Sequence, residues 1–406
     1  MRLDLTTGEP SDPVWDDAPR YWAAFSRAVA DLPAPVAAVH REALRHNALD
    51  LVVRAAGVPI RIATKSVRSR DVLAAVLAIP GYRGLLAYSL SEALWLAADH
   101  DDVVVGYPTV DRAALAQLAV DPVAADRITL MVDDVAQLDL IDAVVAPTSR
   151  EQIRLAVDVD ASWRHPVLGH IGVRRSPVHE PTEAERLARM IVDRPGFRLA
   201  GLMMYEAQVA GVADAGSAAI RWMQRRSVAE LRDRRAEVVA RVAAVAPVEF
   251  VNGGGTGSLE STAADSAVTE VTAGSGLLAG HLFDGYRGFR PAPASAFAVD
   301  VVRAPTHGVV TALGGGWTAS GPAGLSRLPI PVWPEDLHLL PHEGAGEVQT
   351  PVAGDGTASL RVGSRVWFRH AKSGELCERT DRLHVVSAGR VVAEVPTYRG
   401  EGRSFA

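Results

Sequence analysis

Residues 60–65 read Ile60-Arg61-Ile62-Ala63-Thr64-Lys65, a short apolar run that ends on an amine. A run of this kind is typical of a buried β-strand, so Lys65 stands where a strand gives way to a loop. Seven similar runs occur along the chain: Pro35–Val39, Gly84–Tyr88, Asp102–Gly106, Arg127–Val132, Ile153–Val159, Arg198–Met204 and Val248–Val251. Segments with helical periodicity separate them, which is the pattern of βα units around a parallel sheet. Eight such units predict a closed (β/α)8 barrel with Lys65 at its rim.

A lysine at a strand end is, taken alone, more often a surface residue than a reactive group. The other predicted strand ends carry further polar side chains: Tyr88, Ser89, Asp133, Asp134, Asp158, Asp160, Tyr205 and Asn252. In a barrel these ends meet on one rim, where such folds carry out chemistry, although strands generally stop where polar residues begin. A lysine at that rim suits imine formation with a carbonyl or with a pyridoxal cofactor.

Two glycine-rich turns come at and after the last of these runs. The first is Gly253-Gly254-Gly255-Thr256-Gly257, and the second is Gly274-Ser275-Gly276. Turns at this place in a barrel commonly bind phosphate through backbone N–H groups, and glycine lets the backbone approach the phosphate oxygens. Neither turn has the spacing of a dinucleotide fingerprint, and Ser275 lacks the setting of a hydrolase nucleophile. Together with a rim lysine, the turns predict a site for a 5′-phosphate.

The character of the chain changes past about Tyr286, where Pro and Gly interrupt short apolar runs that predict antiparallel strands. We therefore expect an N-terminal helical segment over residues 1–30, a (β/α)8 barrel over 31–289 and a C-terminal antiparallel β domain over 290–406. Tyr21-Trp22 and Phe25, in an apolar helical pattern, predict that the first segment packs against one of the domains. The Arg-rich helical stretch Val212–Ala246 is expected to present a solvated face.

Composition narrows the classes of function. The 406 residues include 42 Lys and Arg and 48 Asp and Glu, and the resulting net charge of −6 argues against nucleic acid as a partner. Cys377 is the single cysteine, so no intrachain disulfide is expected. The first residues lack the apolar core of a secretion signal, and no uncharged run is long enough to span a bilayer. These features predict a cytoplasmic protein without a membrane partner.

The order of these motifs resembles the fold type III pyridoxal-phosphate enzymes, which join an alanine-racemase-like barrel to a β domain. The residues that carry the resemblance are Pro35-Val36-Ala37, Ala63-Thr64-Lys65, Tyr205 and the two glycine-rich turns. The segments 346–351 and 368–372 are more similar to the D-threonine aldolase and D-serine dehydratase branch than to alanine racemase itself. The resemblance covers nearly the whole chain from about residue 30. It implies pyridoxal 5′-phosphate as cofactor, an amino acid as substrate and a homodimer.

The resemblance also implies roles for individual residues. Lys65 would form the imine with the cofactor, Tyr205 would line the pocket, and one of Arg174 and Arg175 would lie near the pyridine ring. The implied phosphate cradle consists of Gly255, Thr256, Gly257, Ser275 and Gly276. An arginine beside the ring would leave its nitrogen unprotonated, because a fixed cation repels a second proton. From the residues alone, Tyr205 is equally a packed strand-end aromatic and either arginine is equally a surface charge.

Members of the branch that this chain resembles hold a divalent metal through a His-X-Cys or His-X-Asp pair in the β domain. This chain has His370-Ala371-Lys372 there, and a protonated lysine has no lone pair for a metal and repels the ion. We therefore expect no metal at this position, and Cys377 would ligate only if the chain folded back. His370 becomes the candidate acid or base and Lys372 the candidate source of positive charge or of a proton. The alternatives are a packed histidine and a solvent-facing lysine.

These residues predict a pyridoxal-phosphate-dependent lyase that acts on a D- or β-hydroxy amino acid. The substrate amine would displace Lys65, and aldol cleavage or dehydration with deamination would follow. Three alternatives stay open: a racemase, which needs two bases on opposite faces of Cα, a non-catalytic pyridoxal-phosphate carrier, and a barrel enzyme without the cofactor.

Overall fold

The computed structural model describes residues 3–7 and 13–405. The chain divides into two compact units, each assembled from segments that are far apart in the sequence. The barrel unit consists of Leu51–Lys65, Gly81–Ala273 and Phe405–Ala406. The sheet unit consists of Met1–Asp50, Ser66–Pro80 and Gly274–Ser404.

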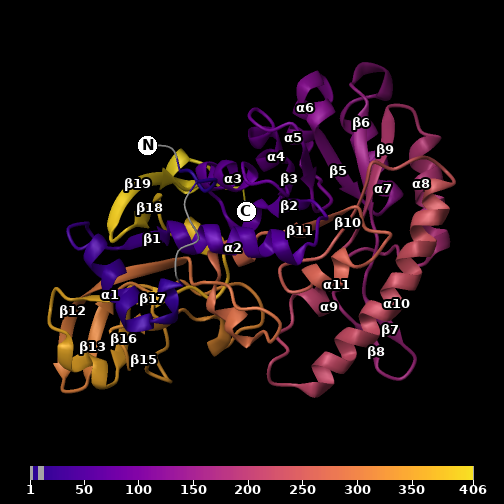
Figure 1. Cartoon of the computed structure of the whole chain (residues 1–406). Coiled ribbons are helices and arrows are strands. Elements are labelled where there is room, and N and C mark those ends of the chain that lie inside the picture. The colour runs from indigo at the N-terminus through magenta and orange to yellow at the C-terminus, as the bar shows by residue number, and fades with distance from the viewer. Residues whose placement is uncertain (1–2, 8–12, 406) are drawn as a thin grey trace. The chain divides into compact units, whose positions relative to one another are not determined.

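The barrel unit contains a closed ring of eight parallel strands (Figure 1). In order around the ring these are β10 (Phe250–Gly253), β11 (Glu270–Ala273), β2 (Ile60–Ala63), β3 (Tyr82–Ala87), β4 (Val103–Val105), β5 (Ile128–Val132), β6 (Ile153–Asp158) and β9 (Phe197–Met204). Together with the separate sheet described below, this ring confirms the predicted fold class of a (β/α)8 barrel with a β domain.

One predicted barrel strand is wrong. The run Pro35–Val39 corresponds to β1 (Val36–His40), which lies in the sheet unit, antiparallel to β12 (Ser295–Thr306) and parallel to β18 (Arg382–Ser387). The missing member of the ring is β11, which the sequence analysis does not predict as a strand. The other seven predicted runs each overlap a strand of the barrel.

Helices connect the barrel strands on the outside of the ring (Figure 1). They are α4 (Leu90–Leu96), α5 (Arg112–Val120), α6 (Pro122–Arg127), α7 (Val135–Val144), α8 (Pro181–Val192), α9 (Ala207–Ala210), α10 (Ala218–Ala243) and α11 (Leu259–Ala263). A hairpin of β7 (Trp163–His165) and β8 (Gly169–Ile171) is inserted between β6 and α8. Within the described part of the chain, no helix has the length and the apolar character needed to cross a membrane.

The sheet unit is built on nine strands. Besides β1, β12 and β18, they are β13 (Val309–Leu313), β14 (Ile330–Trp333), β15 (His338–Leu339), β16 (Gln349–Ala353), β17 (Arg365–Arg369) and β19 (Arg390–Pro396). The helices α1 (Ala18–Ala28), α3 (Arg70–Leu77) and α12 (Ser275–Leu278) belong to this unit, and α2 (Arg41–Arg54) begins in it.

Helix α1 packs on this sheet. The ring centroid of Phe25 lies 4.8 Å from that of Trp367 on β17, and Tyr21 and Trp22 belong to the same buried cluster. This packing confirms the apolar helical pattern expected within residues 1–30. Residues 1–2 and 8–12 of that predicted segment lie outside the described residues.

Candidate active site

Lys65 lies directly after β2, in a 3-10 turn formed by Thr64–Ser66. The Thr64 hydroxyl donates a hydrogen bond of 3.1 Å to the Leu86 carbonyl on the neighbouring strand β3, and this bond anchors the turn. The Lys65 ammonium donates to the Tyr107 hydroxyl at 2.9 Å, and Lys65 is exposed. The amine is therefore held at the carboxyl ends of the barrel strands and is accessible to a small aldehyde.

Tyr107 is a residue of this site that the sequence analysis misses. It follows β4 by two residues, just past the predicted run Asp102–Gly106, and its ring centroid lies 5.5 Å from the Lys65 nitrogen. An aromatic residue directly after a barrel strand is the feature that could have identified it, because strand ends form the rim.

The Arg175 guanidinium lies against the rings of both Tyr107 and Tyr205. The central carbon of the Arg175 guanidinium lies 5.9 Å from the Tyr107 ring centroid and 6.0 Å from that of Tyr205, within the range of cation–π attraction. Burial raises the pKa of Tyr205 to about 12; the charge of Glu206 adds to this rise and Arg175 opposes it. The Tyr205 hydroxyl therefore keeps its proton at neutral pH. Of the two arginines that the sequence leaves open, the structure places Arg175 against these rings.

A buried carboxylate shapes the first glycine-rich turn. Glu206, only 1% exposed, accepts hydrogen bonds from the Gly254 backbone N–H at 3.2 Å and from the Ser258 hydroxyl at 2.7 Å, and it also accepts one from Thr262. Gly254 has a φ of +83°, which glycine adopts without strain. A Cβ on Gly255 would lie 3.2 Å from the Tyr205 ring and 2.9 Å from the Ala210 side chain. The turn therefore passes close to the Tyr205 ring.

Glu206 is held by a cation from α10. Arg235 donates to Glu206 at 3.3 Å and to Asp265 at 2.5 Å, and both Arg234 and Arg235 are buried. The expectation that the Arg-rich helix presents only a solvated face is therefore wrong for these two positions. Helical periodicity does not identify these two arginines as buried. In the sequence, an arginine that pairs with buried carboxylates and carbonyls does not differ from one on the surface.

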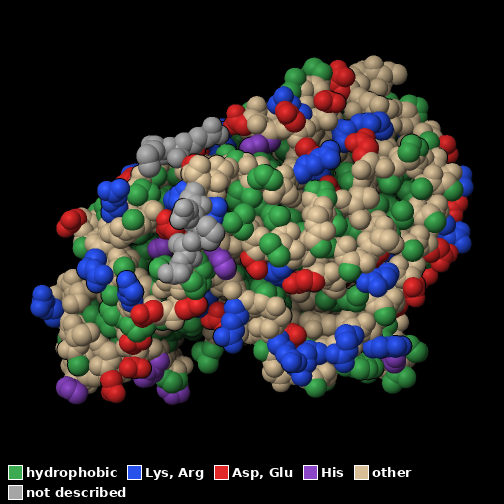
Figure 2. All heavy atoms as spheres, in the orientation of Figure 1, with side chains coloured by type: hydrophobic (Ala, Val, Ile, Leu, Met, Phe, Trp, Pro, Cys, Tyr) green, Lys and Arg blue, Asp and Glu red, His purple; other side chains and the backbone are tan. Residues whose placement is uncertain are grey.

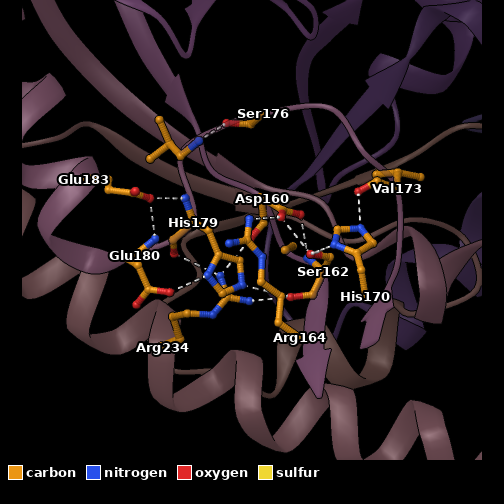
Figure 3. Close-up of polar contacts among 12 residues, drawn as sticks. Asp160, Ser162, Arg164, His170, Val173, Ser176, His179, Glu180, Glu183 and Arg234 are labelled. Atoms are coloured by element: carbon orange, nitrogen blue, oxygen red, sulfur yellow. Dashed lines mark hydrogen bonds and ion pairs between the residues drawn. The ribbon is translucent and has the colours of Figure 1, made fainter. Parts of the chain in front are cut away.

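The base of the β7–β8 hairpin is a polar frame beside the rim (Figure 3). Asp160 accepts hydrogen bonds from the Ser162 backbone at 2.9 Å, the Ser162 hydroxyl at 2.7 Å and Arg164 at 3.1 Å. Burial raises the pKa of Asp160, but these hydrogen bonds outweigh burial and hold its pKa below the usual value. Asp160 therefore stays ionised.

Inside the ring, polar residues cluster around Arg61. Its guanidinium, 2% exposed, pairs with Glu270 at 2.7 Å and with Asp102 at 2.8 Å. Asn252 donates to the same Glu270 at 2.8 Å and accepts from Thr272 at 3.0 Å. Asn252, predicted at the rim, is thus part of a buried network that supports β10, β11 and β2.

Asp158 ends β6 and follows Ala156 by two residues, so both side chains lie on the same face of the strand. Ala156 belongs to the buried cluster within the ring. Burial raises the pKa of Asp158 to about 7, the neighbouring Asp133 and Asp160 raise it further, and Arg175 opposes the rise. Asp158 is therefore a group next to Arg175 that exchanges a proton near neutral pH.

Replacing Asp158 with Asn should stabilise the protein at alkaline pH. Because its pKa is raised in the folded state, the aspartate favours folding below about pH 4, and that contribution is lost as the pH rises through about 7. Asn does not ionise, and Asp158 is partly exposed, so we expect a gain of about 1–3 kcal/mol at pH 8.5 relative to pH 5. Urea unfolding across this pH range measures it. The exposed Asp126→Asn is the control; equal pH profiles for wild type and Asp158→Asn would contradict the prediction.

The remaining candidate residues lie in the sheet unit. His370 is buried and its Nε2 lies 3.4 Å from the Ser373 hydroxyl, which donates to the Ser275 carbonyl at 2.7 Å. Burial, with Arg369 and His281 adding to the effect, lowers the pKa of His370 to about 3. The imidazole is therefore neutral near pH 7. The Lys372 ammonium donates to the Ser320 hydroxyl at 2.8 Å.

These residues do not fit a divalent metal. His370 Nδ1 is buried and has no hydrogen-bond partner among the described residues, so it could serve as one ligand. Lys372, two residues on, offers an ammonium and not an electron pair. Across the described residues, no three His, Cys, Asp or Glu side chains gather as a ligand set. Cys377 is buried elsewhere, with its sulfur 3.2 Å from the Val67 carbonyl.

Comparisons with known proteins identify the family of this chain. A family model described as the N-terminal domain of alanine racemase matches residues 39–280. A D-threonine aldolase from Arthrobacter sp. is 28% identical over 231 residues, which are 54% of this chain and 53% of that protein. The match thus spans about half the length of this relative.

Two solved structures share the fold. A D-threonine aldolase from Filomicrobium marinum aligns with a TM-score of 0.77 and 20% identity, over 92% of this chain and 96% of that one. A D-threo-3-hydroxyaspartate dehydratase from Delftia sp. HT23 aligns with a TM-score of 0.66 and 18% identity, over 91% of this chain and 98% of that one.

Proposed function

Since the chain belongs to the family of the alanine racemase N-terminal domain, we propose that it is a pyridoxal-phosphate-dependent lyase of D- or β-hydroxy amino acids. The observation that carries the proposal is the Lys65 amine at the end of β2, which donates a hydrogen bond to the Tyr107 hydroxyl. The Arg175 guanidinium lies against the rings of Tyr107 and Tyr205. The similarity to a D-threonine aldolase supports a lyase rather than a racemase.

The residues around Lys65 fit the cofactor. Lys65 would bind its aldehyde, Tyr205 would line its ring, and the turn at Thr256 and Gly257 would hold its phosphate. We propose the same role for Ser275 and Gly276, the second and third residues after β11 in the chain. When bound, the cofactor supplies a carbonyl for the substrate amine and a conjugated ring that accepts electrons from a bond broken at or beside Cα.

The side chains of the chain do the remaining work. Lys65 would provide the amine that takes a proton from Cα. Arg175 is permanently charged, so it disfavours protonation of a ring nitrogen placed beside it. Tyr107 accepts a hydrogen bond from Lys65 and so orients the amine.

Proton transfer at the β-hydroxyl is proposed for the sheet unit. Aldol cleavage needs a base on that hydroxyl, and dehydration needs an acid. The Ser373 hydroxyl donates to the Ser275 carbonyl and therefore accepts from His370 Nε2–H. In the neutral ring, Nδ1 is then a hydrogen-bond acceptor and not an acid. Lys372 carries the positive charge or the proton. In this scheme Lys372 provides the positive charge in place of a metal, because an ammonium at the second ligand position has no lone pair for an ion.

Replacing Lys372 with Met should lower turnover by about 10²–10⁴-fold, the usual contribution of a general acid or base, and leave cofactor absorbance unchanged. Lys372→Arg keeps the charge but gives up a proton far less readily, so its activity separates the two roles. The exposed Arg303→Met is the matched control in the same unit. Full turnover in Lys372→Met would remove this residue from the mechanism.

The function itself is tested on purified protein with added pyridoxal phosphate. We expect a visible absorbance band and release of an aldehyde or of ammonia from D-β-hydroxy amino acids, with the L-isomers as controls. Retention of the substrate skeleton with loss of chirality in heavy water would instead indicate a racemase. Protein that never acquires the absorbance band would contradict the proposal.

A further inference from the structure

The buried Ser373 hydroxyl joins two segments of the sheet unit that are far apart in the sequence. It donates a hydrogen bond of 2.7 Å to the Ser275 carbonyl in the second glycine-rich turn, and it is only 7% exposed. Because its proton is given to Ser275, the hydroxyl accepts from the Gly280 backbone N–H at 3.3 Å and from His370 Nε2 at 3.4 Å. The donor and both lone pairs of this one group are therefore used inside the protein.

Backbone contacts join the same two segments. The His281 backbone N–H donates to the His370 carbonyl at 2.9 Å. A Cβ on Gly280 would lie 2.3 Å from the Ala371 carbonyl oxygen, so the two chains approach more closely here than any other residue type would allow. The turn after α12 and the loop of residues 369–375 thus pack against each other in one defined arrangement.

A cation holds the far end of this contact. Arg369, the last residue of β17, donates to the Ala279 carbonyl at 3.3 Å and to Asp284 at 2.7 Å. Ala279 is buried and has a φ of +57°, a left-handed conformation that a residue with a Cβ disfavours. Such a conformation persists only where the surrounding contacts hold it. The end of α12 therefore depends on the loop of residues 369–375 for its shape.

The same loop carries Lys372, the residue next to Ser373. The Lys372 ammonium donates to the Ser320 hydroxyl at 2.8 Å, and the Ser320 backbone N–H donates to the Glu375 carboxylate at 3.0 Å. No set of metal ligands gathers among the residues that the structure describes, so a metal ion is not expected to fix this loop. Hydrogen bonds through Ser373 and Ser320 fix it instead.

We propose that Ser373 is a positioning residue that couples the phosphate site to the loop of His370 and Lys372. A phosphate held by the turn at Ser275 would favour the arrangement in which the Ser275 carbonyl meets Ser373, and this arrangement also fixes the loop. The coupling is reciprocal, because two sites that share one arrangement stabilise each other to the same extent. This inference rests on the proposed function, which assigns the cofactor phosphate to this turn.

Cofactor affinity tests the effect of Ser373 on the turn. Pyridoxal and pyridoxal phosphate carry the same aldehyde, so the ratio of their dissociation constants, measured by absorbance on the full chain, isolates the contacts of the phosphate. We expect Ser373→Ala to reduce the preference for pyridoxal phosphate by about 10-fold, as the loss of one buried hydrogen bond does. A general loss of folded protein weakens both dissociation constants and leaves their ratio unchanged.

Ser359 provides the matched control in the same unit. Its hydroxyl donates to the Gly356 carbonyl at 2.9 Å but is exposed, so Ser359→Ala should keep the wild-type ratio. An unchanged ratio in Ser373→Ala would overturn the proposal.

Hydrogen exchange tests the coupling itself. In the wild type, pyridoxal phosphate should slow amide exchange in residues 369–376 more than pyridoxal does, and Ser373→Ala should abolish this difference. Figure 2 shows charged side chains of both signs spread over the visible face of the molecule. The contacts of Ser373 are neutral and buried, so the difference should persist at high ionic strength, which screens such surface charges.

Inorganic phosphate separates failure of the coupling from failure of the proposed function. Slower exchange of residues 369–376 with phosphate in the wild type, and not in Ser373→Ala, would keep the coupling even if pyridoxal phosphate gave no absorbance band, a result that would reject the lyase. Protein that binds pyridoxal phosphate and cleaves an amino acid, but exchanges residues 369–376 equally with and without the cofactor, would reject the coupling and keep the lyase.

Discussion

Replacing Lys65 with Ala should abolish turnover, with a loss of at least about 10³-fold in kcat, because removing a covalent nucleophile costs this much or more in well-studied enzymes. The same variant should lose the visible absorbance that pyridoxal phosphate gives when joined to an amine. The structure supports both expectations, since Lys65 is exposed at a strand end and its amine is held by Tyr107. Absorbance spectra and steady-state rates on the same preparations measure the two effects.

The lysine content of the chain makes the assignment of the labelled residue unambiguous. Lysine occurs at only two positions, 65 and 372, among the 42 Lys and Arg residues. Borohydride reduction of the holoenzyme followed by peptide mass analysis should therefore label the peptide of Lys65 and leave that of Lys372 unlabelled. Lys65→Arg is the matched control, because it keeps the charge and lacks a nucleophilic amine near neutral pH. Label on Lys372, or wild-type absorbance in Lys65→Ala, would refute the assignment.

The barrel could be predicted from the sequence because seven of its strands are short apolar runs between helices. The eighth, β11, escapes prediction because Glu270 and Thr272 are polar; they satisfy Arg61 and Asn252 inside the ring. β1 is mistaken for a barrel strand for the opposite reason. Its residues are buried and apolar, and local sequence does not specify which strands it pairs with.

The candidate site could be predicted only as far as strand ends reveal it. Lys65 and Tyr205 end their runs directly, so the pattern finds them. Ser89 and Asp134 also follow predicted runs, yet they cap the helices α4 and α7, since a residue shortly after a barrel strand often starts the next helix. The choice of Arg175 over Arg174 depends on where loop side chains point, and neither periodicity nor spacing encodes that direction.

Replacing Glu206 with Gln should lower the affinity for pyridoxal phosphate by about 10–100-fold and destabilise the barrel by about 2–4 kcal/mol, the cost of breaking a buried, charged hydrogen-bond network. Glu206 accepts from the Gly254 backbone, from Ser258 and from Thr262, and it pairs with Arg235. An amide presents one accepting oxygen in place of two, so the glycine-rich turn loses part of what shapes it. Cofactor titration by absorbance and urea unfolding measure the two effects.

Glu237 provides the control for this variant. It lies on α10, the helix that carries Arg235, and pairs with Arg241 at 2.8 Å, and both side chains are exposed (55% and 40%). An exposed ion pair contributes about 0–1 kcal/mol, so Glu237→Gln should change stability and cofactor affinity little. If both variants lost cofactor equally, the loss of one negative charge from the barrel unit would be responsible and not the buried network. A larger loss in Glu206→Gln would show that a carboxylate distant from the reacting atoms sets the shape of the phosphate site.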